Sequence, residues 1–293
     1  MVKIAIVGSG TMGNGIAHVF ALHNYKVSMV DTNPDVLSIA TNSIFKNLER
    51  QVLKGTITKK QKDEALSRII TTTNLSEAVN QTSLVIEAVP ESFQLKEKIF
   101  KELDEITKSD TILASNTSSI SITKLGAATN RPDKVIGMHF MNPVPVMKLV
   151  EVICGYNTST ETIEKIKKIG LELDKSPVIV SDYPGFIANR ILMPMINEAI
   201  FALHEGVAGV EEIDTIMKLG MAHPMGPLQL ADFIGLDVCL SILNVLHNEL
   251  GNPKYAPCPL LIKMVDAGHL GRKQGIGFYH WTKELKVADA FRK

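Results

Sequence analysis

The opening of the chain constrains the fold more than any other stretch, because an apolar run, a glycine cluster and a helical pattern follow one another directly. Five of the six residues 2–7 are apolar, which predicts a strand buried on both faces. Glycines at the spacing G-x-G-x-x-G come next, then a helical pattern over residues 16–22 and a second apolar run at 27–30. This succession predicts a βαβ unit whose turn binds a dinucleotide.

Each residue of the turn has a mechanical role in such a unit. Gly8 permits the tight turn, Gly10 lets the backbone approach a pyrophosphate, and Gly13 lets the helix pack closely on the strand. Thr11 and Met12 begin the helix, where free N–H groups and the helix dipole favour phosphate. We assign all five residues to a cofactor site. A glycine turn that binds nothing is the alternative.

Asp31 follows the second strand at the position where an acid can accept hydrogen bonds from a ribose. Its carboxylate would repel a ribose phosphate, which favours NAD over NADP. FAD uses the same glycine fingerprint and stays open on this stretch alone.

Composition narrows the class of protein. The 293 residues suffice for two domains, and 45% hydrophobic with 21% charged residues is typical of a globular protein. The net charge of zero provides no overall attraction to nucleic acid or to an anionic membrane. Cys154, Cys239 and Cys258 are widely spaced, and no residue cluster has the spacing of metal ligands. We therefore expect no metal site. Met1 leads directly into the first strand, and no apolar run is long enough to span a membrane, so we expect a cytoplasmic protein.

Strand and helix patterns alternate along the first part of the chain. Strands are predicted at 68–72, 84–89, 111–114, 134–140, 148–153 and 177–181, and helices at 35–53, 58–66, 76–80, 91–106 and from a capping box at 158–161 to about residue 174. Such alternation predicts a parallel, doubly wound α/β sheet of the Rossmann type, with a helical pair near 35–67 as an excursion. Ligand groups should lie at the carboxyl ends of the strands, namely at Ala88, Glu91, the loop 115–119 and His139.

The character of the chain changes after residues 182–185. Helical patterns follow at 186–204, 211–219, 228–250 and 260–267. We therefore predict an α/β domain over residues 1–183 and an all-α domain over 184–293. The apolar content of the second domain indicates that a partner subunit covers part of its surface.

A local excess of cations lies on the predicted helical pair. It consists of Lys46, Arg50, Lys54, Lys59, Lys60 and Lys62. Charge alone favours a solvated helical face, and the alternative is a surface that binds a polyphosphate substrate.

Hydride transfer to or from a carbinol carbon needs a group that takes or gives the hydroxyl proton, and histidine suits this role near neutral pH. His139 is the histidine at the end of a predicted sheet strand, and Glu151, on the neighbouring strand-like segment, could fix its tautomer. A structural histidine beside an unrelated glutamate is the alternative. Ser118 and Asn189 could bind a substrate carbonyl or could merely cap turns.

Several motifs together resemble the 3-hydroxyacyl-CoA dehydrogenases, and most of all their stand-alone bacterial members that act on hydroxybutyryl-CoA. They lie at residues 8–13, 115–119, 139–152, 182–190 and 223–227, in order along essentially the whole chain.

The resemblance implies roles for individual residues. His139 is the acid/base, Glu151 its partner, and Ser118 and Asn189 hold the substrate oxygen. Cofactor contacts fall on Asp31, Ala88, Glu91, Lys96, Asn116, Ser118, Asn142 and Lys273, and Lys54 matches a coenzyme A contact. It also implies S stereochemistry and a dimer through the helical domain.

We therefore predict an NAD-dependent (S)-3-hydroxyacyl-CoA dehydrogenase whose partner is an acyl-CoA substrate, with no nucleic acid and no membrane partner. Two alternatives remain. One is a dehydrogenase of a free 3-hydroxy acid such as a sugar acid, on the same fold, and the other is a catalytically idle NAD-binding relative.

Overall fold

The computed structural model describes residues 2–282 and 285–291. The chain forms two compact units, residues 1–183 and 184–293, each with its own hydrophobic core. They are described separately below.

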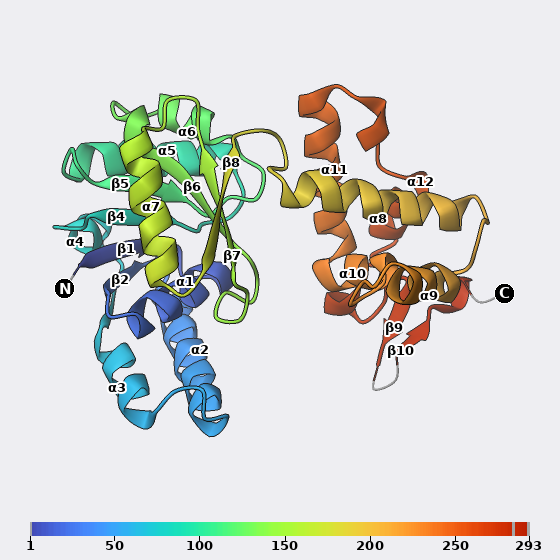
Figure 1. Ribbon diagram of the computed structural model, residues 1–293, viewed down its shortest axis with the longest axis horizontal. Helices are drawn as coiled ribbons and strands as arrows, with labels where there is room; N and C mark the ends of the chain where they lie inside the picture. The colour runs from blue at the N-terminus through green and yellow to red at the C-terminus, as the bar shows by residue number, and fades with distance from the viewer. Residues whose placement is uncertain (1, 283–284, 292–293) are drawn as a thin grey trace. The chain divides into compact units, whose positions relative to one another are not determined.

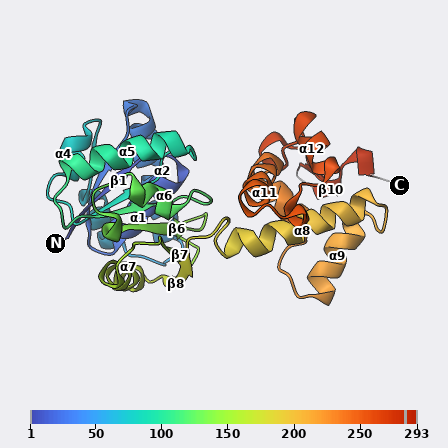
Figure 2. The ribbon, with the colours of Figure 1, turned by 90° about the horizontal axis from the view of Figure 1, so that it is seen from above.

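An eight-stranded sheet organises the N-terminal unit, with the strand order β3-β2-β1-β4-β5-β6-β7-β8. The strands are β1 (Lys3–Val7), β2 (Lys26–Val30), β3 (Ile69–Thr72), β4 (Leu84–Glu87), β5 (Ile112–Ser115), β6 (Val135–Phe140), β7 (Leu149–Cys154) and β8 (Ser176–Ser181). The helices are α1 (Thr11–Leu22), α2 (Pro34–Leu53), α3 (Lys59–Ser67), α4 (Leu75–Val79), α5 (Phe93–Ile106), α6 (Ile122–Ala127) and α7 (Thr160–Glu172) (Figure 1). Figure 2 shows α5 and α7 on opposite faces of the sheet, the arrangement of a doubly wound fold.

Strand β7 runs antiparallel to β6, and β8 is parallel to β7. The alternation of strands and helices predicts a sheet that is parallel throughout, and at β7 this prediction is wrong. A parallel neighbour needs a crossover of about a dozen residues or more. Only the loop 141–148 joins β6 to β7, so the chain turns straight back on itself.

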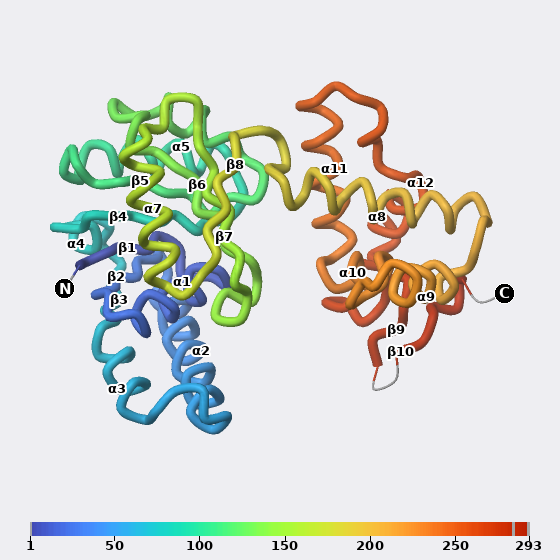
Figure 3. Tube along the Cα trace, in the orientation of Figure 1, coloured from blue at the N-terminus to red at the C-terminus, as the bar shows by residue number. Residues whose placement is uncertain are grey.

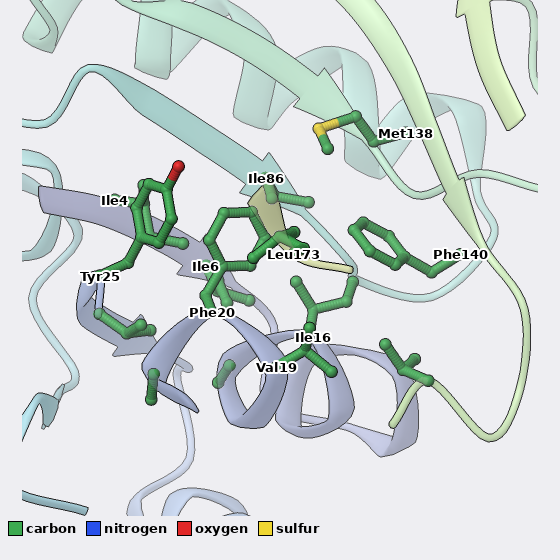
Figure 4. Packing of buried hydrophobic residues seen from close by; sticks show 14 of the residues in the cluster. Ile4, Ile6, Ile16, Val19, Phe20, Tyr25, Ile86, Met138, Phe140 and Leu173 are labelled. Carbon is green, nitrogen blue, oxygen red and sulfur yellow. The ribbon is translucent and has the colours of Figure 1, made fainter. Parts of the chain in front are cut away.

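The core of this unit lies between the sheet, α1 and α7. Ile16 and Phe20 of α1 pack against Ile6 of β1, and Leu173, just after α7, closes the same cluster (Figure 4). Helix α1 is thereby fixed directly behind the glycine turn.

The helices α2 and α3 form the connection from β2 to β3, as Figure 3 shows. Helix α2 buries Leu37, Ile44 and Leu48. Thr58 caps α3 in a capping box with Gln61. The capping box predicted at 158–161 is wrong by one residue, since Ser159 caps α7 while the Thr158 hydroxyl donates to the Val135 carbonyl.

The C-terminal unit contains α8 (Ala188–His204), α9 (Val210–Gly220), α10 (Pro227–Ile234), α11 (Leu236–Leu250) and α12 (Pro259–Asp266). The helix predicted over 228–250 is two helices, because Gly235 adopts φ +109° and bends the chain by 97° between α10 and α11. Within the described residues no single helix has the length and apolar character to cross a membrane, although the bent pair α10 and α11 meets that test jointly.

A small hairpin, β9 (Tyr279–Trp281) with β10 (Leu285–Val287), adds to the helical C-terminal unit. The buried Asp232 accepts hydrogen bonds from the backbone N–H groups of Phe278 and Tyr279 and from the indole of Trp281. Burial raises the pKa of Asp232, and these three donors oppose the shift. The carboxyl group thus fastens the hairpin to α10.

Candidate active site

The glycine turn has the geometry that its sequence predicts. Gly8 has φ +97°, and a Cβ there would lie 2.7 Å from the Ala88 carbonyl oxygen. A Cβ on Gly13 would lie 1.9 Å from the Gly8 carbonyl oxygen, whereas one on Gly10 would meet nothing within 4 Å. Packing therefore requires glycine at two positions, and the space beside Gly10 is open.

The start of α1 fits a phosphate group. No side chain caps this helix, and its first turn, with Thr11 and Met12, holds no acidic residue. Uncapped N–H groups and the positive end of the helix dipole favour an anion. Together with the open space at Gly10, these features fit the pyrophosphate of a dinucleotide.

Asp31 lies beside this turn at the end of β2. Its Oδ2 accepts hydrogen bonds from the Ser9 backbone N–H (2.8 Å) and the Ser9 hydroxyl (2.9 Å), and its Oδ1 accepts one from the Asn33 N–H. The carboxylate thus anchors the glycine turn and is also partly exposed, as a ribose contact requires.

His139 and Glu151 lie directly opposite each other in the antiparallel pair β6 and β7. The His139 Nδ1 is 2.8 Å from the Glu151 Oε2, and the His139 Nε2 is 3.0 Å from the Ser118 hydroxyl. His139 and Glu151 are both buried. Three of the predicted catalytic residues therefore form one continuous line from three elements.

The loop after β5 carries Ser118 and is held from two sides. Asn116 accepts a hydrogen bond from the Phe140 N–H, which joins the loop to the end of β6. The Glu91 Oε1 accepts hydrogen bonds from the Ser118 N–H (2.9 Å) and from the Ser119 N–H and hydroxyl (both 3.0 Å). Glu91 thus fixes the backbone that presents Ser118.

Lys96 lies among acidic and carbonyl groups of the N-terminal unit. Its ammonium group is buried, donates to Glu87 (2.7 Å) and to the Val89 carbonyl (3.2 Å), and lies 3.4 Å from the Glu91 Oε2. Lys96 therefore stabilises the Glu91 carboxylate by charge. Glu87 escaped the sequence analysis, and the signal that could have found it is a single acid inside an otherwise apolar strand, Leu84–Glu87.

Three further predicted residues are described here within their own units. Asn142 is exposed after β6, next to the cis peptide bond to Pro143. Asn189 and Lys273 belong to the C-terminal unit, where Asn189 is buried in the first turn of α8 and Lys273 donates to Asp237.

The basic patch is smaller than its sequence suggests. Lys62 is only 9% exposed, pairs with Glu49 at 3.5 Å and lies over the Phe45 ring. Arg50 donates to Asn47, and Lys60 pairs with Glu64. Lys54 is exposed just after α2, and Lys46 within α2 and Lys59 at the start of α3 are also exposed.

Within residues 2–282 and 285–291, no group of three or more His, Cys, Asp or Glu side chains is arranged to hold a metal ion. The three cysteines there are free thiols.

Residues 3–183 match the NAD binding domain of 3-hydroxyacyl-CoA dehydrogenase, and residues 185–281 match the C-terminal domain of the same enzyme. This chain belongs to the 3-hydroxyacyl-CoA dehydrogenase family. The 3-hydroxybutyryl-CoA dehydrogenase of Bradyrhizobium diazoefficiens is 53% identical over 279 residues, which cover 95% of each chain. The probable 3-hydroxybutyryl-CoA dehydrogenase of Bacillus subtilis is 52% identical over 96% of this chain and 98% of its own. The crystal structure of (S)-3-hydroxybutyryl-CoA dehydrogenase from Ralstonia eutropha matches with a TM-score of 0.93 and 49% identity, covering 96% of this chain and 99% of that one.

Membership of the 3-hydroxyacyl-CoA dehydrogenase family confirms the predicted fold class and the predicted cofactor. The chain is an NAD-dependent oxidoreductase that acts on a CH–OH group. FAD, which the glycine fingerprint alone left open, is thereby excluded.

Proposed function

We propose that this chain is an (S)-3-hydroxybutyryl-CoA dehydrogenase, which interconverts (S)-3-hydroxybutyryl-CoA and acetoacetyl-CoA with NAD. The line Ser118, His139 and Glu151 is the observation that carries this proposal. Its hydrogen bonds orient His139, the proton-transfer group that oxidation of a secondary alcohol needs.

His139 acts as the general base for alcohol oxidation. The Glu151 carboxylate accepts the Nδ1–H, so Nε2 is the unprotonated nitrogen and lies on the side of the ring that faces Ser118. Nε2 takes the hydroxyl proton, and Glu151 stabilises the imidazolium that forms. In the reverse direction the same imidazolium returns the proton to the alkoxide oxygen.

NAD, when bound, supplies the hydride acceptor at the carbinol carbon. Gly8, Gly10, Thr11, Met12, Gly13 and Asp31 would hold it, together with Ala88, Glu91, Asn116, Ser118, Asn142 and Lys273. We assign Lys96 to the support of Glu91 within this site. Ser118 and Asn189 would bind the substrate oxygen and stabilise its developing charge.

Lys54 would contact the phosphates of coenzyme A. It is exposed at the end of α2, and Lys46 and Lys59 add exposed positive charge nearby in the sequence. This proposal gives the acyl-CoA its own binding surface on the helical pair.

We also infer that the enzyme acts in the cytoplasm as a homodimer formed through the C-terminal unit. Three free thiols suit a reducing compartment. Several large apolar side chains of the C-terminal unit are exposed, among them Val207, Leu219 and Met221.

Initial rates of NADH oxidation test the function. We expect fast turnover with acetoacetyl-CoA, little with free acetoacetate, and slow turnover with NADPH. The charge reversal Lys54→Glu should raise the KM for acetoacetyl-CoA at least about tenfold, or about 1.4 kcal/mol. The matched control Lys108→Glu reverses the charge of an exposed lysine between α5 and β5 and should leave the KM unchanged.

Each other outcome points elsewhere. An unchanged KM in Lys54→Glu, or equal rates with free acetoacetate, would favour the dehydrogenase of a free 3-hydroxy acid. No turnover with any hydroxy acid, despite NADH binding, would favour the idle relative.

A further inference from the structure

A buried carboxylate at the end of β4 has no part in the mechanism above. Glu87 is 0% exposed and lies between the strand neighbours β1 and β5, where it pairs in register with Val7 and Ser115. Burying an ionised carboxylate is costly unless donors surround it. Three donors do so here: the Val89 N–H (2.7 Å), the Lys96 ammonium (2.7 Å) and the Ser115 hydroxyl (2.6 Å).

The contacts continue from Glu87 toward the site through Lys96. The Lys96 side chain is 1% exposed, so its position is set by the groups around it. Besides Glu87, these are the Val89 carbonyl and the Glu91 carboxylate. Glu87 and the Val89 carbonyl hold the ammonium group at the place where it can attract Glu91.

Glu91 carries the chain of contacts to the catalytic loop. Burial alone would raise the pKa of Glu91, but Lys96 and the hydrogen bonds from Thr117, Ser119 and Ser118 together lower it. Glu91 is therefore a carboxylate that binds the N–H groups of this loop, and the Ser118 hydroxyl lies next to the His139 Nε2.

We propose that Glu87 is a positioning residue for the dehydrogenase reaction: it fixes Lys96, which fixes Glu91, which sets the loop that places Ser118 against His139. This inference rests on the proposed function, because that function gives Ser118 and His139 their roles. Glu87 touches neither substrate nor cofactor in this scheme.

Asp104 shows what a carboxylate with a purely structural role looks like in the same unit. It is also buried, and it accepts hydrogen bonds from Arg131 and Asn130. Its contacts join α5 to the segment before β6 and reach no residue of the site. Asp104→Asn is thus a matched control for Glu87→Gln.

The test compares kcat for acetoacetyl-CoA reduction in a double-mutant cycle. Gln at position 87 can keep three hydrogen bonds but removes the charge that holds Lys96. Since a displacement of about 1 Å can cost about a hundredfold in rate, we expect Glu87→Gln to lower kcat by about tenfold or more. In a Ser118→Ala background the same change should cost less than about twofold, because residues that act through one another are not additive.

Asp104→Asn should lower the stability and leave kcat within about twofold of the parent in both backgrounds. An equal kcat loss from Glu87→Gln with and without Ser118 would overturn the proposal, as would a kcat equal to wild type.

A readout without substrate separates this inference from the proposed function. The ring nitrogen signals of His139, assigned with His139→Gln, should shift by NMR in Glu87→Gln as they do in Ser118→Ala, and should stay in place in Asp104→Asn. Unchanged signals in Glu87→Gln overturn the positioning role. If wild type fails to turn over acetoacetyl-CoA, the proposed function is wrong, while the His139 signals still decide where Ser118 lies.

If Glu87→Gln does not fold, the double variant Glu87→Gln with Lys96→Met replaces it, because no unpaired buried cation remains there. The same NMR shift and the same loss of additivity with Ser118→Ala are expected from it, and their absence contradicts the proposal.

Discussion

Single side chains around the site hold the backbone as well as serving the chemistry proposed for them. Asn116 bonds to the Phe140 N–H, Glu91 bonds to the backbone of the Ser118 loop, and Asp31 bonds to Ser9. Substitution of any of these therefore disturbs the local backbone together with ligand binding. His139 and Glu151 bond to each other, and His139 also contacts the Ser118 hydroxyl, so their substitution changes the proton-transfer pair itself.

Replacing either member of the His139 and Glu151 pair should lower kcat more than it changes the KM for NADH. We expect His139→Gln to lose about 10²- to 10⁴-fold in kcat, since it removes the acid/base. Glu151→Gln should lose about 10²-fold or more, because a neutral amide no longer stabilises the imidazolium. Initial rates over a range of pH measure both effects. Full turnover by His139→Gln would contradict the assignment.

Asp104 should make the stability of the N-terminal unit depend on acid pH. Burial alone would raise its pKa, but Asn130 and Arg131 lower it below its ordinary value of 3.8. A carboxyl group whose folded pKa is depressed contributes stability above the unfolded pKa and loses it as the pH falls through the folded pKa. Urea unfolding between about pH 6 and about pH 3 should show a steeper loss for wild type than for Asp104→Asn. Parallel curves would exclude this role.

The residue-level chemistry could be predicted from sequence only in part. His139 stands out because a histidine ends a strand, and Glu151 because it lies on the next one, yet their direct opposition depends on the antiparallel register, which neither residue encodes. Lys96 matches a cofactor contact in sequence, and that role stays a prediction; the sequence did not indicate that its charge is buried among Glu87, Glu91 and a carbonyl. Glu87 is hidden because strand periodicity treats it as one polar residue in a buried run.

At the scale of elements, two glycines of the turn between β1 and α1 have different roles: Gly13 is needed for folding, and Gly10 for binding of the dinucleotide. A methyl group on Gly13 would collide with the Gly8 carbonyl, while one on Gly10 would enter open space. We expect Gly13→Ala to destabilise the protein by about 1–3 kcal/mol or more, because the clash is with backbone. Gly10→Ala should change stability by less than about 0.5 kcal/mol.

Gly10→Ala should weaken NADH binding although it hardly changes stability. The added methyl group occupies the space where a pyrophosphate would approach, so the Kd for NADH should rise by at least about tenfold. Fluorescence titration of NADH and urea unfolding of the same preparations measure the two effects. Normal NADH affinity in Gly10→Ala would refute the placement of the pyrophosphate.

Element boundaries follow from sequence where a local signal exists and fail where the deciding contact is distant. Thr58 and Gln61 form a capping box within four residues, close to the predicted start of that helix. Thr158 resembles a cap, but its hydroxyl donates a hydrogen bond to the carbonyl of Val135, which is distant in sequence, and Ser159 caps the helix instead. Apolar periodicity runs on through 228–250 because both helices bury residues there, so Gly235 alone marks the bend.

At the scale of the whole molecule, two separate cores predict two folding units. The N-terminal core surrounds Phe20 and Ile86, and the C-terminal core surrounds Ile196 and Leu243. The C-terminal unit also exposes Val207 and Leu219, which suits burial against a second copy.

We expect sedimentation equilibrium to give a mass of twice the 32.1 kDa of one chain. The unfolding midpoint should rise with protein concentration, because association stabilises the folded state by mass action. The substitution Leu219→Lys, at an exposed position of α9, should reduce the dimer fraction if that face is the contact, and Lys263→Ala, on the exposed surface of α12, serves as a control of similar exposure. A single-chain mass at every concentration would contradict the dimer.

The bond between Asp31 and Ser9 has a consequence for anyone who would re-engineer the coenzyme preference. A search for NADP-using variants begins by randomising the acid that meets the ribose. Here that acid also holds the glycine turn through two hydrogen bonds to Ser9. Each such variant therefore loosens the turn that would bind the pyrophosphate, while it makes room for the ribose phosphate of NADP. A successful switch would have to rebuild the anchor at position 9 in the same step, and one-residue libraries would miss it.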